Sequence, residues 1–113
     1  MIELEVTPMP CVLEDGETQT LAVNVGFKTI VGMIIPASFE GVTLTFHVAP
    51  RPGDTYQPLY DSAGNAVSFT VASNRQIWVP AEVFGGVKNL KITSNTAADG
   101  ADREITLLAK HRD

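Results

Sequence analysis

Apolar and polar residues alternate with a period of two along most of this chain, and no other feature of the sequence constrains the fold as strongly. The alternation is clearest in residues 42–48, where valine, leucine and phenylalanine are separated by threonine and histidine. It returns in residues 67–71, 90–93 and 104–109. Because successive side chains of a strand point to opposite faces, each segment should have one apolar and one polar face. No stretch of eleven residues shows the 3.6-residue period of an amphipathic helix.

Turn-forming residues separate these segments. Residues 50–54 and 61–65 are rich in proline, glycine, aspartate and asparagine, which tight turns require. Short alternating strands between regular turns are typical of two packed antiparallel sheets. The sequence therefore predicts an all-β fold, an antiparallel β-sandwich with jelly-roll-like connections. The expected strands are residues 2–7, 19–25, 28–35, 42–48, 56–60, 66–72, 75–79, 87–93 and 103–109.

Two of these strands carry a more specific prediction. Residues 29–35 are nearly all apolar, which favours a central strand that is covered on both faces. Pro58 interrupts the strand at 56–60, and since proline cannot donate to a ladder, this strand should lie at an edge. The residues expected to point into the core are Val42, Leu44, Phe46, Val67, Phe69, Val71, Leu90, Ile92, Ile105 and Leu107.

The length of 113 residues indicates a single domain. We assign residues 13–110 to the sandwich and interpret residues 1–12 as either an N-terminal arm or the first strand. Ile2, Leu4 and Val6 alternate with two glutamates, which gives this segment one apolar edge. Unpaired strand edges accept strands of neighbouring chains, so these three residues are candidate partner contacts.

Charge and cysteine content exclude several classes of partner. Eight basic and thirteen acidic residues give a net charge of −5, with no basic cluster. Nucleic acids and anionic membranes need a footprint of lysine and arginine, so we expect neither as a partner. Cys11 is the only cysteine, which rules out an intrachain disulfide and suits folding in a reducing cytosol. The N-terminal residues match neither a signal peptide nor a membrane span.

No catalytic or metal-binding constellation is recognisable. None of the serines lies in a Gly-x-Ser-x-Gly elbow, and neither His47 nor His111 belongs to a known motif. The spacing of histidine and cysteine does not fit a zinc site. We therefore predict no enzyme activity, no catalytic residue, no bound metal and no cofactor. Loop aspartates leave calcium as an open alternative, although they are also common turn residues: Asp54, Asp61, Asp99 and Asp102.

The aromatic residues bear on whether a sugar could bind. A β-sandwich that binds carbohydrate usually presents an exposed aromatic platform, and the candidates here are Trp78, Tyr56 and Tyr60. Large aromatic side chains in so small a domain are more often part of the core. We therefore expect Trp78 to be mainly buried, and we place the phenylalanines at core positions.

Several short motifs follow one another in a particular order between residues 13 and 108. In chain order they are residues 31–37 (VGMIIPA), 44–46 (LTF), 60–65 (YDSAGN), 79–80 (VP), 84–88 (FGGVK), 90–94 (LKITS) and 101–107 (ADREITL). In this order and spacing, the chain resembles small virion structural proteins of tailed bacteriophages. It departs from them at Phe39, where a tryptophan would be expected, and in residues 94–101, which do not have glycine and glutamine at the expected places.

The resemblance implies a non-enzymatic β-sandwich attached to a phage particle, commonly as a decoration or cement protein that stabilises the outer surface of the head. It implies the major capsid protein, copies of the same chain, or both as partners, and a location at the virion surface after residence in the host cytoplasm. The loop at 94–101, with Asn95 and Asp99, is then a candidate contact. A wider resemblance, to galactose-binding and discoidin-like sandwiches, implies the alternative of a carbohydrate-binding module of a phage tail or fibre that uses Trp78, Tyr56 and Tyr60.

Overall fold

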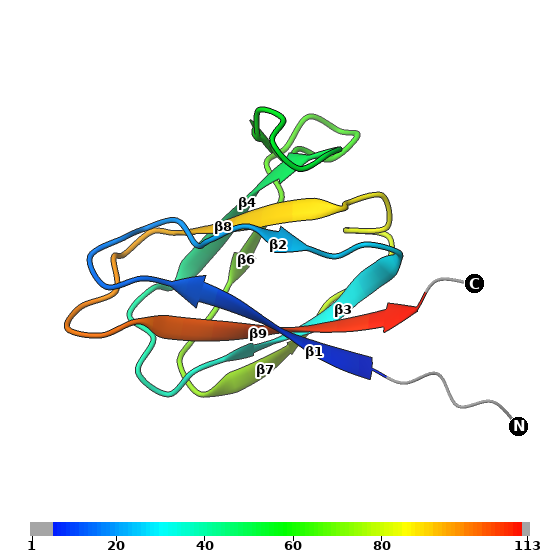
Figure 1. The fold of residues 1–113 in the computed structure, drawn as a ribbon. Coiled ribbons are helices and arrows are strands. Elements are labelled where there is room, and N and C mark those ends of the chain that lie inside the picture. The colour runs from blue at the N-terminus through cyan, green and yellow to red at the C-terminus, as the bar shows by residue number, and fades with distance from the viewer. Residues whose placement is uncertain (1–5, 112–113) are drawn as a thin grey trace, which may run out of the picture.

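Two antiparallel β-sheets pack face to face, as the alternation predicts (Figure 1). The computed structural model describes residues 6–111, and no helix forms within this range. The strands are β1 (Val6–Leu13), β2 (Val23–Asn24), β3 (Lys28–Ile35), β4 (Thr43–Ala49), β5 (Gln57–Pro58), β6 (Ser68–Thr70), β7 (Arg75–Trp78), β8 (Asn89–Ser94) and β9 (Arg103–His111).

The strand order shows how the chain connects the two sheets. The first sheet has the order β1-β9-β3-β7, and the second has the order β2-β8-β4-β5, with β6 also paired to β4. The chain crosses from one sheet to the other at every connection except those that join β4, β5 and β6. Repeated crossing of this kind is jelly-roll-like, and the predicted all-β sandwich is confirmed.

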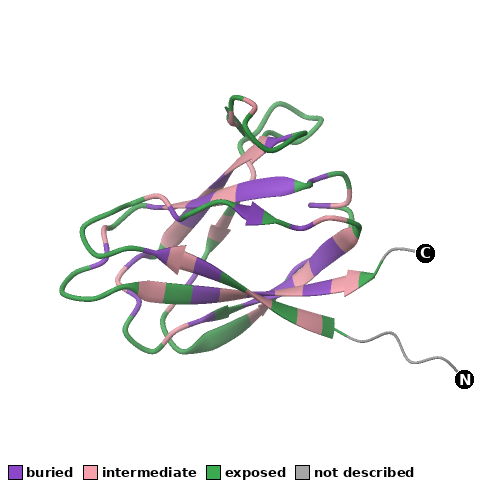
Figure 2. Ribbon diagram, in the orientation of Figure 1, coloured by how far each residue is buried: buried purple, intermediate pink, exposed green. Residues whose placement is uncertain are grey.

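The core lies between the sheets and consists of the inward residues of each strand. Buried residues alternate with more exposed ones along β9, where Ile105 and Leu107 are fully buried (Figure 2). Phe46, Phe69 and Phe84 meet edge to face, with the ring centroids of Phe46 and Phe84 4.9 Å apart. Such contacts stabilise a core beyond the burial of apolar area alone.

The predicted core residues face inward with one exception. The buried ones are Leu44, Phe46, Val71, Leu90, Ile92, Ile105 and Leu107, and the partly buried ones are Val67 and Phe69. Val42 was expected in the core, but 53% of its surface is exposed, so this prediction is wrong. Val42 precedes β4, which begins at Thr43, and the alternation of the strand therefore does not extend to it.

The first strand begins later than predicted and belongs to the sandwich. β1 covers Val6–Leu13 instead of residues 2–7, and each of its residues pairs with β9. Cys11 and Leu13 are buried in the core, so residues 6–12 form the first strand and do not extend from the domain as an arm. Ile2 and Leu4, two of the predicted contacts, lie outside the described residues, whereas Val6 is half exposed.

Two prolines determine the character of the free edge of β1. The strand pairs with β9 on one side only, and proline has no N–H to donate to that ladder. The nitrogens of Pro8 and Pro10 therefore point away from β9. The Val12 carbonyl points to the same outer side, where it accepts a hydrogen bond from Leu21 N at 3.0 Å. An edge without N–H groups at two positions is a poor template for another strand.

β3 and β5 test the two specific strand predictions. β5, which contains Pro58, lies at the edge of the second sheet as predicted. β3 has the predicted bounds and lies between β9 and β7. The prediction that both of its faces are covered is wrong, because Ile34 is 38% exposed and no element of the described chain packs over the outer face of the first sheet.

Replacing Phe46 with alanine should lower the free energy of unfolding by about 3–5 kcal/mol, because the change empties a fully buried site next to Phe69 and Phe84. Urea denaturation followed by circular dichroism measures this loss. Val42→Ala is the control, since it shortens an exposed side chain and should change stability by no more than about 0.5 kcal/mol. Equal losses in the two variants would contradict the assigned core.

Candidate functional site

The outer faces of the two sheets differ in chemistry. The outward side chains of β4, β6 and β8 in the second sheet are polar, and they are Thr43, Thr45, His47, Ser68, Thr70, Lys91 and Thr93. The outward side chains of the first sheet are mostly apolar. A polar face is compatible with water, whereas a contiguous apolar surface on a small domain marks a site of interaction.

Cross-strand pairing arranges the outward residues of the first sheet in two rows. The first row, from β1 to β7, is Pro8, Leu108, Gly32 and Trp78. The second row is Pro10, Thr106, Ile34 and Gln76. Val6 and Val31 adjoin the first row. We call these two rows, together with Val6 and Val31, the apolar face.

A depression lies on the apolar face beside the row that contains Gly32. A Cβ at Gly32 would lie 3.2 Å from both Leu108 Cδ1 and the Ile77 carbonyl oxygen, so the glycine leaves room for the leucine to lie across β3. The depression has a volume of about 270 Å³, and it is lined by Val6, Val31, Gln76, Ile77, Trp78 and Leu108. Small-molecule sites usually occupy about 300–1,000 Å³, so this hollow suits one or two side chains of a partner better.

Trp78 is the most exposed large apolar residue within residues 6–111, with 82% of its surface accessible. The prediction that it is mainly buried is wrong. Ile77 packs against the core and Val79 is buried, so the period of the strand turns Trp78 outward. The alternation around residue 78 was visible in the sequence. We nevertheless expected Trp78 to be buried, because large aromatic side chains in a small domain are more often part of the core. Phe27, also expected in the core, is exposed in the turn before β3.

The three aromatic residues predicted to bind sugar do not share one surface. Trp78 belongs to the apolar face, whereas Tyr60 is exposed and lines a separate cavity. Tyr56 is partly buried, and the ammonium group of Lys91 lies 4.6 Å from its ring centroid. Of these three residues, Trp78 and Tyr60 are therefore exposed, at two separate places.

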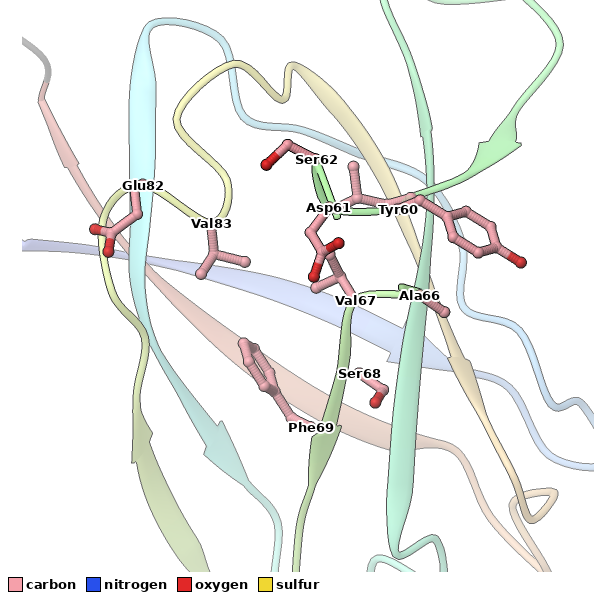
Figure 3. Close-up of a pocket in the computed structure, with 10 residues that line it drawn as sticks. Tyr60, Asp61, Ser62, Ala66, Val67, Ser68, Phe69, Glu82 and Val83 are labelled. Atoms are coloured by element: carbon pink, nitrogen blue, oxygen red, sulfur yellow. The ribbon is translucent and has the colours of Figure 1, made fainter. Parts of the chain in front are cut away.

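The cavity beside Tyr60 has a volume of about 650 Å³ (Figure 3). Its apolar lining residues are Leu59, Ala66, Val67, Phe69 and Val83. Its polar lining residues are Tyr60, Asp61, Ser62, Ser68 and Glu82. Asp61 Oδ1 accepts hydrogen bonds from the main-chain N–H groups of Ala63 and Asn65, each at 2.9 Å, and so holds the turn next to the cavity. Carboxylates, hydroxyls and an aromatic ring around a hollow of this size are compatible with a small polar ligand.

The loop at 94–101, predicted as a partner contact, is held in place by hydrogen bonds to distant parts of the chain. Asn95 Oδ1 accepts bonds from two successive main-chain N–H groups at the start of β4, at 2.8 and 2.9 Å. Gly100 N donates to Asp15 Oδ1 at 2.8 Å. Asn95 therefore has a structural role in the loop, and both Asn95 and Asp99 are exposed at its surface.

An ion pair fixes the far end of this loop. Arg103 Nη2 lies 2.8 Å from Glu40 Oε2 and also donates to the main-chain oxygen of Asp99 at 2.9 Å. Asp99 N in turn donates to Glu40 Oε2 at 3.1 Å. The hydrogen bond from Arg103 lowers the pKa of the Glu40 carboxyl, and the same bond raises the pKa of Arg103. The conformation of the loop therefore depends on an ionised Glu40.

Cys11 is part of the core. Its Sγ donates to Thr20 Oγ1 at 3.2 Å, and the same hydroxyl oxygen accepts a bond from Ile92 N at 2.9 Å. Burial raises the pKa of the thiol to about 11, so a thiolate is rare at neutral pH. The residue links β1 to β8 through a buried polar contact.

The remaining candidate residues take part in structural contacts. His47 Nδ1 lies 3.3 Å from Thr93 Oγ1 on the polar face of the second sheet. Asp54 pairs with Arg51, and Asp102 accepts a bond from the main chain of Asp15. Among residues 6–111, no group of three or more histidine, cysteine, aspartate or glutamate side chains is placed to hold a metal ion. None of the described segments is a helix that could cross a membrane.

Glu40→Gln should destabilise the protein at neutral pH, because a neutral amide cannot replace the ion pair with Arg103. The pKa of Glu40 is lowered by folding, so the pair contributes stability above the ordinary glutamate pKa of about 4.3 and loses it as the pH falls through the folded value. The difference between wild type and variant in urea denaturation should therefore shrink in acid.

Asp54→Asn is the matched control, since it breaks the more exposed pair with Arg51, and it should have little effect at any pH. A Glu40→Gln deficit that does not change with pH would contradict the role of the ionised carboxylate.

Comparison with known proteins adds no relative to these observations. No family model, no curated protein and no solved structure matches the chain. Function is therefore inferred from the residues and from the geometry of the apolar face, the cavity and the loop.

Proposed function

We propose that this protein is a non-enzymatic structural protein of a bacteriophage particle, a decoration or cement protein that binds the outer surface of the head and stabilises it. The observation that carries the proposal is the apolar face, an exposed sheet surface centred on Trp78 and Leu108. A surface of this kind suits contact with another protein subunit. The order of sequence motifs that resembles phage virion proteins supports the same function.

The loop at 94–101 supplies a second surface for contact with the particle. Asn95 and the ion pair of Arg103 with Glu40 hold the loop in one conformation before any partner binds. A preorganised loop loses little conformational entropy on binding, which favours affinity. Asp99 is exposed on this loop, and we assign it to the contact with the major capsid protein.

Purified protein should co-sediment with heads of the encoding phage that were prepared without it, and it should raise the temperature at which those heads release their DNA. Asp99→Ala should weaken the binding severalfold while the circular dichroism spectrum stays unchanged, because the loop uses the main chain of Asp99 and not its side chain. Asp54→Ala, a change of an aspartate in another loop, is the control. Absence of co-sedimentation by the wild-type protein would rule out the proposal.

A carbohydrate-binding module of a phage tail or fibre is the second candidate function. Two observations favour it: Trp78 is exposed, and the cavity beside Tyr60 combines an aromatic ring with carboxylates and hydroxyls. Aromatic faces stack on sugar rings, and carboxylates accept hydrogen bonds from sugar hydroxyls. The two aromatic residues lie at separate sites, so each would have to bind sugar without the other.

A glycan array titrated with the protein separates the two functions. The decoration protein should show no saturable binding to any glycan. Saturable binding that disappears in Trp78→Ala or in Tyr60→Ala, with an unchanged circular dichroism spectrum, would replace the decoration function with carbohydrate recognition. The variant that loses binding would also identify which of the two sites holds the sugar.

A further inference from the structure

We propose that the apolar face binds the same face of a second copy of this chain, about a twofold axis that lies in the interface and crosses β9 at Leu107. The inference rests on the proposed function only in assigning this face to protein contact. Its starting point is β3, whose sequence is typical of a strand covered on both sides but whose outer residue Ile34 is exposed. A second sheet packed on this face would supply the missing cover.

The charges on β9 are arranged for a partner that runs in the opposite direction. Its outward residues alternate with the buried ones, and they are Glu104, Thr106, Leu108 and Lys110. A twofold axis across the strand at Leu107 places Glu104 of one copy over Lys110 of the other, and Thr106 over Leu108. Each dimer then contains two such pairs of opposite charge, which fix the direction and register of packing.

The sizes of the central side chains are complementary under the same axis. Gly32 pairs with Leu108 and Ile34 pairs with Thr106, so the axis places Gly32 of one copy opposite Ile34 of the other. The isoleucine would enter the depression of about 270 Å³ beside the glycine, next to Trp78. This contact occurs twice in the dimer, with the knob on β3 and the hollow formed by residues of β1, β3, β7 and β9. Because the strands of two packed sheets cross at a small angle, the side chains of the two copies lie most directly opposite each other near the twofold axis, on β9 and β3.

Two other surfaces of the sandwich fit a second copy less well. The free edge of β1 lacks N–H groups at Pro8 and Pro10, and the outer face of the second sheet is polar. The outward part of β9 spans about 20 Å, and four strands span about 15 Å. An interface of this size is below the range of stable specific complexes and belongs to weak, transient association, so the dimer should be weak and depend on concentration.

Sedimentation equilibrium of the purified full chain tests the inference. The apparent mass should rise toward that of a dimer as the concentration increases. Ile34→Asp should remain monomeric over the same range, because a carboxylate would enter the apolar depression of the partner. Val42→Asp is the control: it places the same charge at an exposed valine outside the apolar face, and it should dimerise like the wild type.

Charge reversal tests the register without altering the apolar residues. Glu104→Lys and Lys110→Glu should each weaken the dimer by about tenfold, because each replaces two attractive pairs with two repulsive ones. The double variant should recover dimerisation. A wild-type protein that stays monomeric, an Ile34→Asp variant that still dimerises, or a double variant that fails to recover would overturn the inference.

No phage particle is present in these experiments, so their outcome is independent of the binding to phage heads. A dimer without head binding would remove the proposed function and leave the inference intact. Head binding by a protein that remains monomeric would overturn the inference and leave the proposed function intact.

Discussion

The position of β9 between β1 and β3 is the constraint on which the rest of the structure depends. Its pairing with both strands puts Ile105 and Leu107 in the core and turns Thr106 and Leu108 outward. A shift by one residue would exchange the two sets, because side chains alternate strictly along a strand. The bulge between Ile30 and Gly32 then sets the glycine beside Leu108. The register of β9 therefore determines both which residues enter the core and which residues form the apolar face.

The same register makes the two outer surfaces unequal. Threonine, histidine and lysine face outward on the second sheet, which can therefore remain in water. Tryptophan, leucine and isoleucine face outward on the first. The prolines of β1 oppose association through that strand edge, whereas the apolar face can associate without disturbing the hydrogen bonds of the sheet. The domain itself consists of two sheets packed face to face, and the proposed dimer would use the same kind of packing between two copies.

The loop at 94–101 obtains its shape from contacts across the whole chain. Its anchors include Asp15, Glu40 and the start of β4, which are far from it in sequence. An exposed loop with so many main-chain partners is preorganised, and the ion pair of Glu40 with Arg103 makes this property sensitive to acid. Asn95, a predicted contact residue, also holds the loop in place.

The sequence by itself determined the sandwich, because period-two alternation and turn residues are local properties. It also determined the bounds of β3, the edge position of Pro58 and most of the core from Leu44 to Leu107. Only the tertiary structure decided which faces are covered. Trp78 and Phe27 were assigned to the interior as large aromatic residues and Val42 from the alternation, yet burial depends on what packs opposite, and all three side chains are exposed in the described structure. The candidate surface was missed for the same reason: its residues lie on four strands that only pairing brings together, through contacts between β1, β3, β7 and β9.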